Sequence, residues 1–220
     1  MDFWERWSWE RARERIRGLS GRLGFERGDE LRFFNLRLDL TNGSIYDEVL
    51  ERFLTDRERV GLYYILSLYS ETKSEVKESG ELISLSRQLC PFIHCSNLRR
   101  NIEAVERLFG TDPTLLYKAA KPLDYQPIEI GDAAIKVYAL PRVPIVLVVW
   151  AGEEGIPPSS EILFDKTAFS YLGSEISDVC EAAMGIARAL TARLILSLAR
   201  MLNIDITGIN FGGYGYTCAD

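Results

Sequence analysis

Histidine, lysine and methionine are all scarce in this sequence of 220 residues. There is one histidine, His94, with three methionines and six lysines, and arginine accounts for the other 20 of the 26 basic residues. A single histidine outside any G-x-S-x-G context excludes the usual Ser-His-Asp arrangement of a hydrolase. It also excludes a zinc finger built on a histidine pair. No familiar catalytic motif therefore indicates what the chain does.

Long apolar runs are missing as well. No segment reaches the roughly 18 apolar residues that a membrane span needs, and the start, MDFWERWSWERARERIRG, has no apolar core of a signal peptide. The net charge is −6 and the pI is about 5.1, so the chain lacks the basic surface with which a general nucleic-acid binder displaces counterions. These features predict a cytoplasmic protein that neither enters a membrane nor binds nucleic acid.

Apolar residues are plentiful, at 47% against 26% charged residues, which is typical of a globular protein. A chain of this length buries roughly 70% of its unfolded surface, so it can build a core without staples. We predict an N-terminal aromatic arm and amphipathic helix over residues 1–29 and a single α+β domain over residues 30–202. A Gly/Tyr-rich tail, flexible or docked at an edge, is predicted over residues 203–220.

Apolar periodicity predicts the secondary structure. Apolar residues alternate in LRFFNLRLDL, and the Asn42-Gly43 pair that follows is a strong hairpin signal. The run IVLVVW is apolar throughout, so both faces of that strand should be covered. Strands are predicted near 31–40, 44–46, 132–140, 144–150 and 160–165, and helices near 9–23, 47–69 (divided at Thr55), 97–121 (divided at Gly110) and 175–202. Because strands and helices come in separate runs, the predicted class is α+β with a mainly antiparallel sheet.

Three aromatic residues, Phe3, Trp4 and Trp7, lie ahead of the apolar stripe that begins at Trp9. If a helix began at Asp2, their side chains would fall on the face opposite that stripe. Two interpretations are open. The arm docks within its own chain, or it contacts a second copy at a homo-oligomer interface, where aromatic residues and arginine are enriched.

The segment CPFIHC places three ligand-type residues, Cys90, His94 and Cys95, within six positions. Thiolates and neutral imidazole bind zinc well, but no second CxxC or HxxxH pair accompanies them. The clustered cysteine spacing of iron–sulfur proteins is absent, which argues against such a cluster. Incidental buried thiols, a redox or disulfide pair, and a metal site completed by Cys180, Cys218 or a carboxylate all remain open. A bond from Cys218 to Cys180 would tether the tail.

The segment WAGEEGIPP, which begins at Trp150, interrupts the apolar run with two adjacent glutamates and two prolines. Desolvation beside Trp150 would raise the pKa of a carboxyl group and suit it to general acid–base chemistry. We expect Asp132 and Asp165 near this loop, so that Glu153, Glu154 and Asp165 would converge with Trp150 on a pocket. The alternative is a turn in which the glycines bend the chain, the prolines stiffen it and both glutamates stay in water.

A longer stretch, GDAAIKVYALPRVPIVLVVWAGEEGIPPSSEILFD, resembles a known family. It combines a Gly131-Asp132-Ala133 start, an LPRVP turn, an apolar strand ending in tryptophan, an acidic loop closed by proline, and an LFD strand. These features resemble the prokaryotic family called domain of unknown function 3786, with a looser similarity from about Phe34 to Leu194. The resemblance implies a prokaryotic cytoplasmic protein of unassigned activity. Some relatives carry a cysteine-rich iron–sulfur module that this chain lacks, and Ala151 stands where an acidic residue is common.

Two functional hypotheses follow. The first is a non-catalytic binding or accessory module, whose loop at 151–159 and aromatic arm contact a partner protein or a second copy. The alternative is a small-molecule or redox enzyme with its site between the acidic loop and CPFIHC. The sequence identifies no cofactor for either. Carboxylates that converge on a pocket would favour the enzyme, and carboxylates splayed into solvent would count against it.

Overall fold

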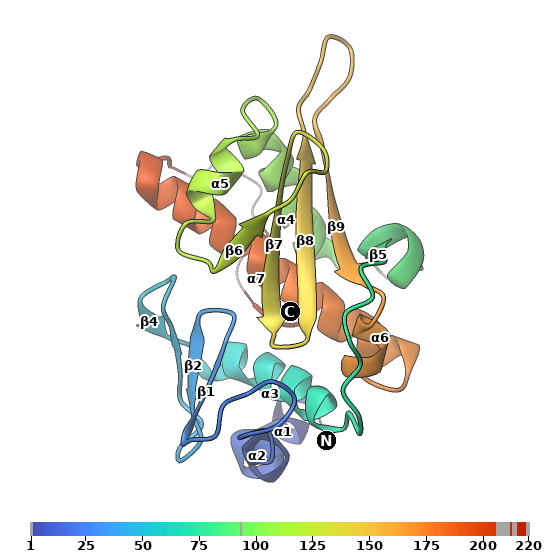
Figure 1. The fold of residues 1–220 in the computed structure, drawn as a ribbon. Coiled ribbons are helices and arrows are strands. Elements are labelled where there is room, and N and C mark those ends of the chain that lie inside the picture. The colour runs from blue at the N-terminus through green and yellow to red at the C-terminus, as the bar shows by residue number, and fades with distance from the viewer. Residues whose placement is uncertain (1, 93, 206–211, 213–214, 219–220) are drawn as a thin grey trace.

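The computed structural model describes residues 2–92, 94–205, 212 and 215–218. It contains two antiparallel sheets and several helices, which confirms the α+β class (Figure 1). The first sheet has the order β1-β2-β3-β4, from Glu30–Phe33, Leu36–Asp39, Ile45–Asp47 and Arg52–Phe53. The second has the order β5-β9-β8-β7-β6, from Leu82–Ser84, Ser159–Asp165, Val143–Trp150, Ala133–Leu140 and Tyr125–Pro127. The helices are α1 (Phe3–Arg6), α2 (Trp9–Arg17), α3 (Asp56–Ser70), the π-helical turn η1 (Leu85–Leu89), α4 (Ser96–Phe109), α5 (Leu115–Ala119), α6 (Ala168–Tyr171) and α7 (Ile176–Leu202).

The five-stranded sheet has two unlike faces. Helices α4, α5 and α7 lie behind it, and no helix of the described residues covers the face toward the viewer (Figure 1). Strand β8 is buried from Val143 to Val149, which confirms that both of its faces are covered. Val146 and Val148 point to the helix-free face and pack with Ala134 in a small second cluster, whereas Val143, Ile145, Leu147 and Val149 belong to the main core.

Helix α7 is the central core helix. By length and composition it meets the criteria for a membrane span, but 89% of its most apolar window is buried inside the protein, and core helices of soluble proteins meet the same criteria. The N-cap of α7 is Glu175, whose side chain makes no capping hydrogen bond.

Of the predicted tail, residues 203–205 are exposed, whereas Gly212 and residues 215–217 are buried, so the prediction of a flexible or edge-docked tail is wrong for the buried residues. Gly185 of α7 allows the approach, since a Cβ there would lie 2.1 Å from the carbonyl oxygen of Tyr216. Arg188 donates hydrogen bonds to the carbonyl oxygens of Thr217 at 2.6 Å and Gly212 at 3.0 Å. Tyr216 and Thr217 are almost fully buried.

The strand predicted at 31–40 is two strands, β1 and β2, joined by a tight turn. Phe34 and Asn35 both adopt positive φ, at 51° and 54°, which is the backbone of a two-residue hairpin turn. The strand predicted at 44–46 is β3, shifted by one residue, and the connection before it contains Asn42 and Gly43. The three strands predicted between 132 and 165 lie within one residue of β7, β8 and β9.

The helix predicted from Asp47 to Leu54 is wrong, because that stretch forms a turn and the short strand β4. The buried carboxylate of Asp47 accepts the backbone N–H groups of Val49 and Leu50, which favours the turn over a helix. The helix begins only at Asp56, where Thr55 and Glu58 form a capping box.

The two other predicted helices also change at their ends. The helix predicted at 9–23 ends at Arg17, although Leu19 and Leu23 are still buried in the turns that follow. The division of the stretch 97–121 into two helices at Gly110 is confirmed, with α4 ending at Phe109 and α5 shorter than predicted, from Leu115 to Ala119.

Between α3 and β5 the chain forms a strap, Thr72–Glu81, that is tied to the body of the protein. The hydroxyl of Tyr171 accepts the N–H of Val76 and donates to its carbonyl oxygen, both at 2.7 Å. Further along, Ser79 and Gly80 donate to the carboxylate of Asp165. The strap is therefore tied both to α6 and to the end of β9.

Candidate binding site at the β8–β9 hairpin

The segment WAGEEGIPP forms the tip of the β8–β9 hairpin, which projects from the sheet (Figure 1). Trp150 and Ser159 are the last paired residues. Glu153 and Ile156 exchange two backbone hydrogen bonds of 3.0 Å, and Gly155 between them has φ 79°. Glycine at this position allows the positive φ of a tight turn. The turn predicted from the glycines is thus present.

Asp132 lies at the base of this hairpin. Its carboxylate accepts the backbone N–H of Ala151 at 2.7 Å, and its own N–H donates to the carbonyl oxygen of Val149 at 3.0 Å. We predicted Asp132 near the loop, and the structure places it there as a backbone-holding group.

Helix α4 holds the other side of the hairpin. The N–H of Gly152 donates to the carbonyl oxygen of Gly110 at 3.0 Å. Glu106 accepts the N–H of Ser160 at 2.9 Å and its hydroxyl at 3.2 Å. With Asp132 on one side and α4 on the other, the hairpin base is a firmly positioned element.

The predicted convergence of carboxylates does not occur. Glu153 and Glu154 are exposed at the tip, whereas Asp165 lies at the far end of β9, opposite Leu82 of β5. A seven-residue strand separates the two ends by about 20 Å. Asp165 therefore cannot act together with the two glutamates. The prediction that Asp165 lies beside the loop is wrong.

Asp165 instead holds the strap. Its carboxylate accepts hydrogen bonds from the N–H and hydroxyl groups of Ser79 and Thr167, and from the N–H of Gly80. Burial alone would raise the pKa of Asp165, but the hydrogen bonds from Thr167 and Ser79 outweigh it and lower the pKa from 3.8 to about 2.

This lowered pKa predicts how stability depends on pH. Because the folded pKa lies below the unfolded one, the ionised carboxylate stabilises the fold above about pH 4, and that contribution is lost as the pH falls toward 2. The shift corresponds to about 2 kcal/mol. We expect Asp165→Asn to lose about this much stability at neutral pH and to show a shallower acid loss in urea titrations. The exposed variant Glu154→Gln is the control, and equal pH slopes for Asp165→Asn and the parent protein would contradict the assignment.

The four cysteines form two disulfides, Cys90–Cys180 and Cys95–Cys218. Of the three interpretations left open for CPFIHC, the structure agrees with disulfide formation. Cys90 and Cys95, however, bond to distant cysteines and not to each other. Cys218 tethers the tail through a disulfide to Cys95, and not to Cys180, which was the partner suggested from the sequence. Among the described residues, no three His, Cys, Asp or Glu side chains are placed to hold a metal ion.

An inner cavity of about 520 Å³ lies between β9, α4 and α7. Ile162, Ile102 and Met184 contribute apolar lining from these three elements, and His94 with Cys95 also lines it. This cavity is where the enzyme hypothesis placed a site, between the acidic loop and CPFIHC. The carboxylate on it, however, is neither Glu153 nor Glu154.

That carboxylate belongs to Glu161, which we did not single out from the sequence. It accepts the hydroxyls of Ser84 at 2.6 Å and Ser86 at 3.2 Å and pairs with Arg87 at 3.3 Å. Side chains alternate along the strand SSEILFD, so Glu161 lies on the same face as Leu163. This alternation is the sequence feature from which the position of Glu161 could have been predicted. Ser84 belongs to β5, and Ser86 and Arg87 belong to η1, so Glu161 joins both elements to β9.

On the helix-free face, a second hollow of about 750 Å³ follows the hairpin, and we call it the hairpin groove. Trp150 and Ile156 line it with exposed fractions of 37% and 61%, together with Pro157 and Leu163. An exposed tryptophan and isoleucine on one groove form an apolar surface of the kind that binding sites present.

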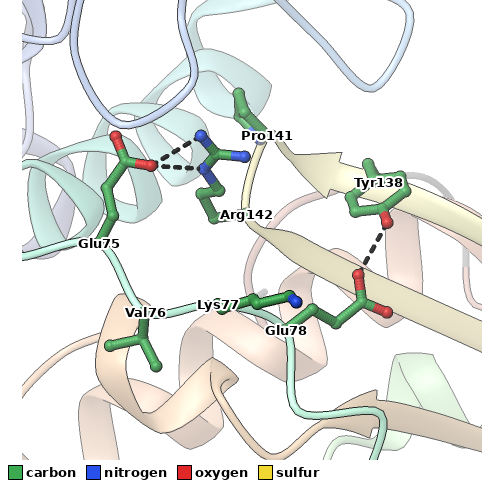
Figure 2. A pocket seen from close by; sticks show the side chains of 7 residues that line it. All are labelled: Glu75, Val76, Lys77, Glu78, Tyr138, Pro141 and Arg142. Atoms are coloured by element: carbon green, nitrogen blue, oxygen red, sulfur yellow. Dashed lines mark hydrogen bonds and ion pairs between the residues drawn. The ribbon is translucent and has the colours of Figure 1, made fainter.

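A third hollow, of about 550 Å³, lies between the strap and the β7–β8 turn (Figure 2). Two acidic residues of the strap bind partners from β7 and the β7–β8 turn: Glu75 pairs with Arg142 at 2.7 Å, and Glu78 accepts the hydroxyl of Tyr138 at 2.8 Å. Lys136 also pairs with Glu78. These pairs fasten the strap to the sheet, so the hollow is part of the strap's attachment.

The aromatic arm docks on α3 within its own chain. Phe3 and Trp7 make edge contacts with the ring of Tyr64, at centroid distances of 5.5 and 5.0 Å. The guanidinium of Arg57 lies 5.0 Å from the ring of Trp4. All three arm residues stay half-exposed. The contacts agree with the first interpretation of the arm, and the homo-oligomer interface remains a prediction.

Comparison with known proteins finds one match. The family model described as Domain of unknown function (DUF3786) matches residues 22–185. That range includes every strand of both sheets and the hairpin, and it ends inside α7. No curated protein and no solved structure matches the chain.

Proposed function

Because this chain belongs to the DUF3786 family, which is described only as a domain of unknown function, we propose a function from the hairpin itself. The protein is a non-catalytic binding module that receives a partner protein at the hairpin groove. The main support for this proposal is that Trp150 and Ile156 are both exposed on one groove of a projecting hairpin. Tryptophan is strongly enriched among the residues that dominate binding energy.

The construction of the hairpin supports binding. At its base the carboxylates of Asp132 and Glu106 accept the backbone N–H groups of Ala151 and Ser160, so little ordering entropy is lost when a partner docks. By contrast, acid–base catalysis needs groups that converge on one reacting atom. Glu153 and Glu154 lie in water, and Asp165 serves the strap. This arrangement favours the binding module over the enzyme.

The charges at the tip indicate the chemistry of the partner. Glu153 and Glu154 are both exposed next to the apolar pair Trp150 and Ile156. A complementary surface presents an apolar side chain for the groove with lysine or arginine beside it, because complementary charge steers association and excludes wrong partners.

The test is a selection from random linear peptides displayed on phage, with the intact protein as target. We expect apolar and basic peptides, whose affinity falls at least about tenfold for Trp150→Ala. The matched control is Phe53→Ala, since Phe53 is 64% exposed on the other sheet, and it should change affinity by less than about twofold. Failure to select any peptide, or equal binding to Trp150→Ala and the parent protein, would remove the proposal.

A further inference from the structure

Strand β9 has an edge beside the hairpin groove that β5 covers only in part. It pairs with β8 from Ser159 to Phe164, but β5 reaches only Leu163, Phe164 and Asp165. Within the described part of the chain, residues Ser159–Ile162 therefore have no strand on that side. An edge of this kind is a template on which another strand can pair.

The amide groups of this edge point outward at alternate residues. The N–H of Ser160 donates to Glu106, and that of Lys166 to the carbonyl oxygen of Glu81 on the β5 side. Because amides alternate in direction along a strand, the N–H of Ile162 faces the same way, whereas those of Glu161 and Leu163 face β8. At Ser160, the carboxylate of Glu106 accepts the N–H group that a carbonyl oxygen of a neighbouring strand would otherwise accept.

Hollows lie on both faces of this edge. The hairpin groove, with Trp150 and Leu163, lies on one face, and the inner cavity, with Ile102 and Met184, lies on the other. Successive side chains of an extended segment point to opposite faces, so a strand laid along β9 would place its side chains into the two hollows in turn. Backbone pairing with pockets for alternate side chains is how sheet edges recognise peptides.

We infer that the partner binds by strand addition: an extended peptide segment pairs with Ser159–Ile162 of β9. This inference rests on the proposed function and names the ligand class for the same site. The segment carries apolar side chains at alternate positions, for the groove and the inner cavity, and a lysine or arginine where it passes Glu153 and Glu154 at the tip.

The first test is N-methylation of each residue in turn along a peptide that binds in a Trp150-dependent manner. We expect a periodic result, in which methylation weakens binding at least about tenfold at alternate residues and less than about threefold between them, because only alternate amides face β9. A uniform response, or a peptide that binds as a helix, overturns strand addition and leaves the proposed function standing. A peptide that binds equally to Trp150→Ala overturns both.

The second test is hydrogen exchange at single amides, read by nuclear magnetic resonance with and without the saturating peptide. We expect exchange of the Ile162 amide to slow at least about tenfold, while the amides of Glu161 and Leu163, already bonded to β8, change little. An unchanged Ile162 amide contradicts the inference. A dimer in which Ile162 is already protected without peptide would assign the edge to a second copy and overturn the peptide as its occupant.

Discussion

Replacing Asp47 with alanine is expected to lower the free energy of unfolding by about 3 to 5 kcal/mol. Asp47 and Arg193 are both 0% exposed, and the Asp47 carboxylate accepts from Nη2 and Nε of Arg193 at 2.9 and 3.3 Å. The same guanidinium donates to the carbonyl oxygen of Phe34 and the hydroxyl of Tyr216. Removing the carboxylate takes away the negative charge that faces Arg193 in the core. Urea unfolding followed by circular dichroism measures the loss.

Two further variants separate charge from mere truncation. Asp56→Ala removes the 93% exposed carboxylate that pairs with Arg59, and it should cost less than about 1 kcal/mol because water screens such pairs. Asp47→Leu combined with Arg193→Met replaces the buried pair with apolar side chains, and it should be more stable than Asp47→Ala. A loss below about 1 kcal/mol for Asp47→Ala would show that the pair does not hold the fold.

The buried pair of Asp47 and Arg193 explains why two predictions from the sequence were wrong. Residues 47–54 were predicted as a helix, but Asp47 is held by an arginine 146 residues further along the chain. Arg193 also holds the turn that divides the strand predicted at 31–40. It donates to the carbonyl oxygen of Phe34 and lies 4.4 Å from that ring, which stabilises a positive φ that phenylalanine rarely adopts. Local periodicity contains no information about a contact so distant.

Where structure is set locally, prediction succeeded. Strand β8 is apolar at every position from Val143 to Val149 and is bounded by a proline-containing turn and by the acidic loop. These signals placed β7, β8 and β9 within one residue. The partly covered edge of β9 could not be predicted in this way, because it depends on where β5 stops pairing. The buried tail was missed for the same reason, since Gly185 and Arg188 act on it from another element.

The misplacement of Asp165 was avoidable. Two strands joined by a short loop are antiparallel, so the loop lies at the start of the second strand and Asp165 at its end, about 20 Å away. Asp132 lies at the loop because β7 and β8 are also antiparallel, which brings the start of β7 beside the end of β8. Strand direction alone therefore predicts that Asp132 lies beside the hairpin loop and that Asp165 lies at the opposite end of β9.

Reduction of the two disulfides is expected to be the other large effect. Cys90–Cys180 and Cys95–Cys218 connect residues that are 90 and 123 positions apart. In the chain-entropy model, each such cross-link stabilises the fold by about 4 to 5 kcal/mol, because it restricts the unfolded chain. Urea unfolding with and without a phosphine reductant should show a marked fall in the midpoint. Superimposable curves would contradict this prediction.

Variants assign the effect to each bond. Cys90→Ser with Cys180→Ser leaves the tail cross-linked, whereas Cys95→Ser with Cys218→Ser frees it from α4 but keeps the contacts of Arg188 with Gly212 and Thr217. Peptide mapping without reductant should recover these two pairs. A Cys180–Cys218 cross-link, or four free thiols in the unfolded and unreduced protein, would contradict the assignment.

The disulfides also bear on the compartment in which the protein works. Thiols in most cytoplasmic proteins stay reduced, whereas disulfides persist in oxidising compartments and in intracellular proteins of hyperthermophiles. Acid quenching of the source cells followed by alkylation would trap the redox state of all four cysteines, and we expect them to resist alkylation until reduced. Ready alkylation would mean that in the cell the described tail is held by Arg188 and by Arg193 at Tyr216, without a covalent bond from Cys218 to Cys95.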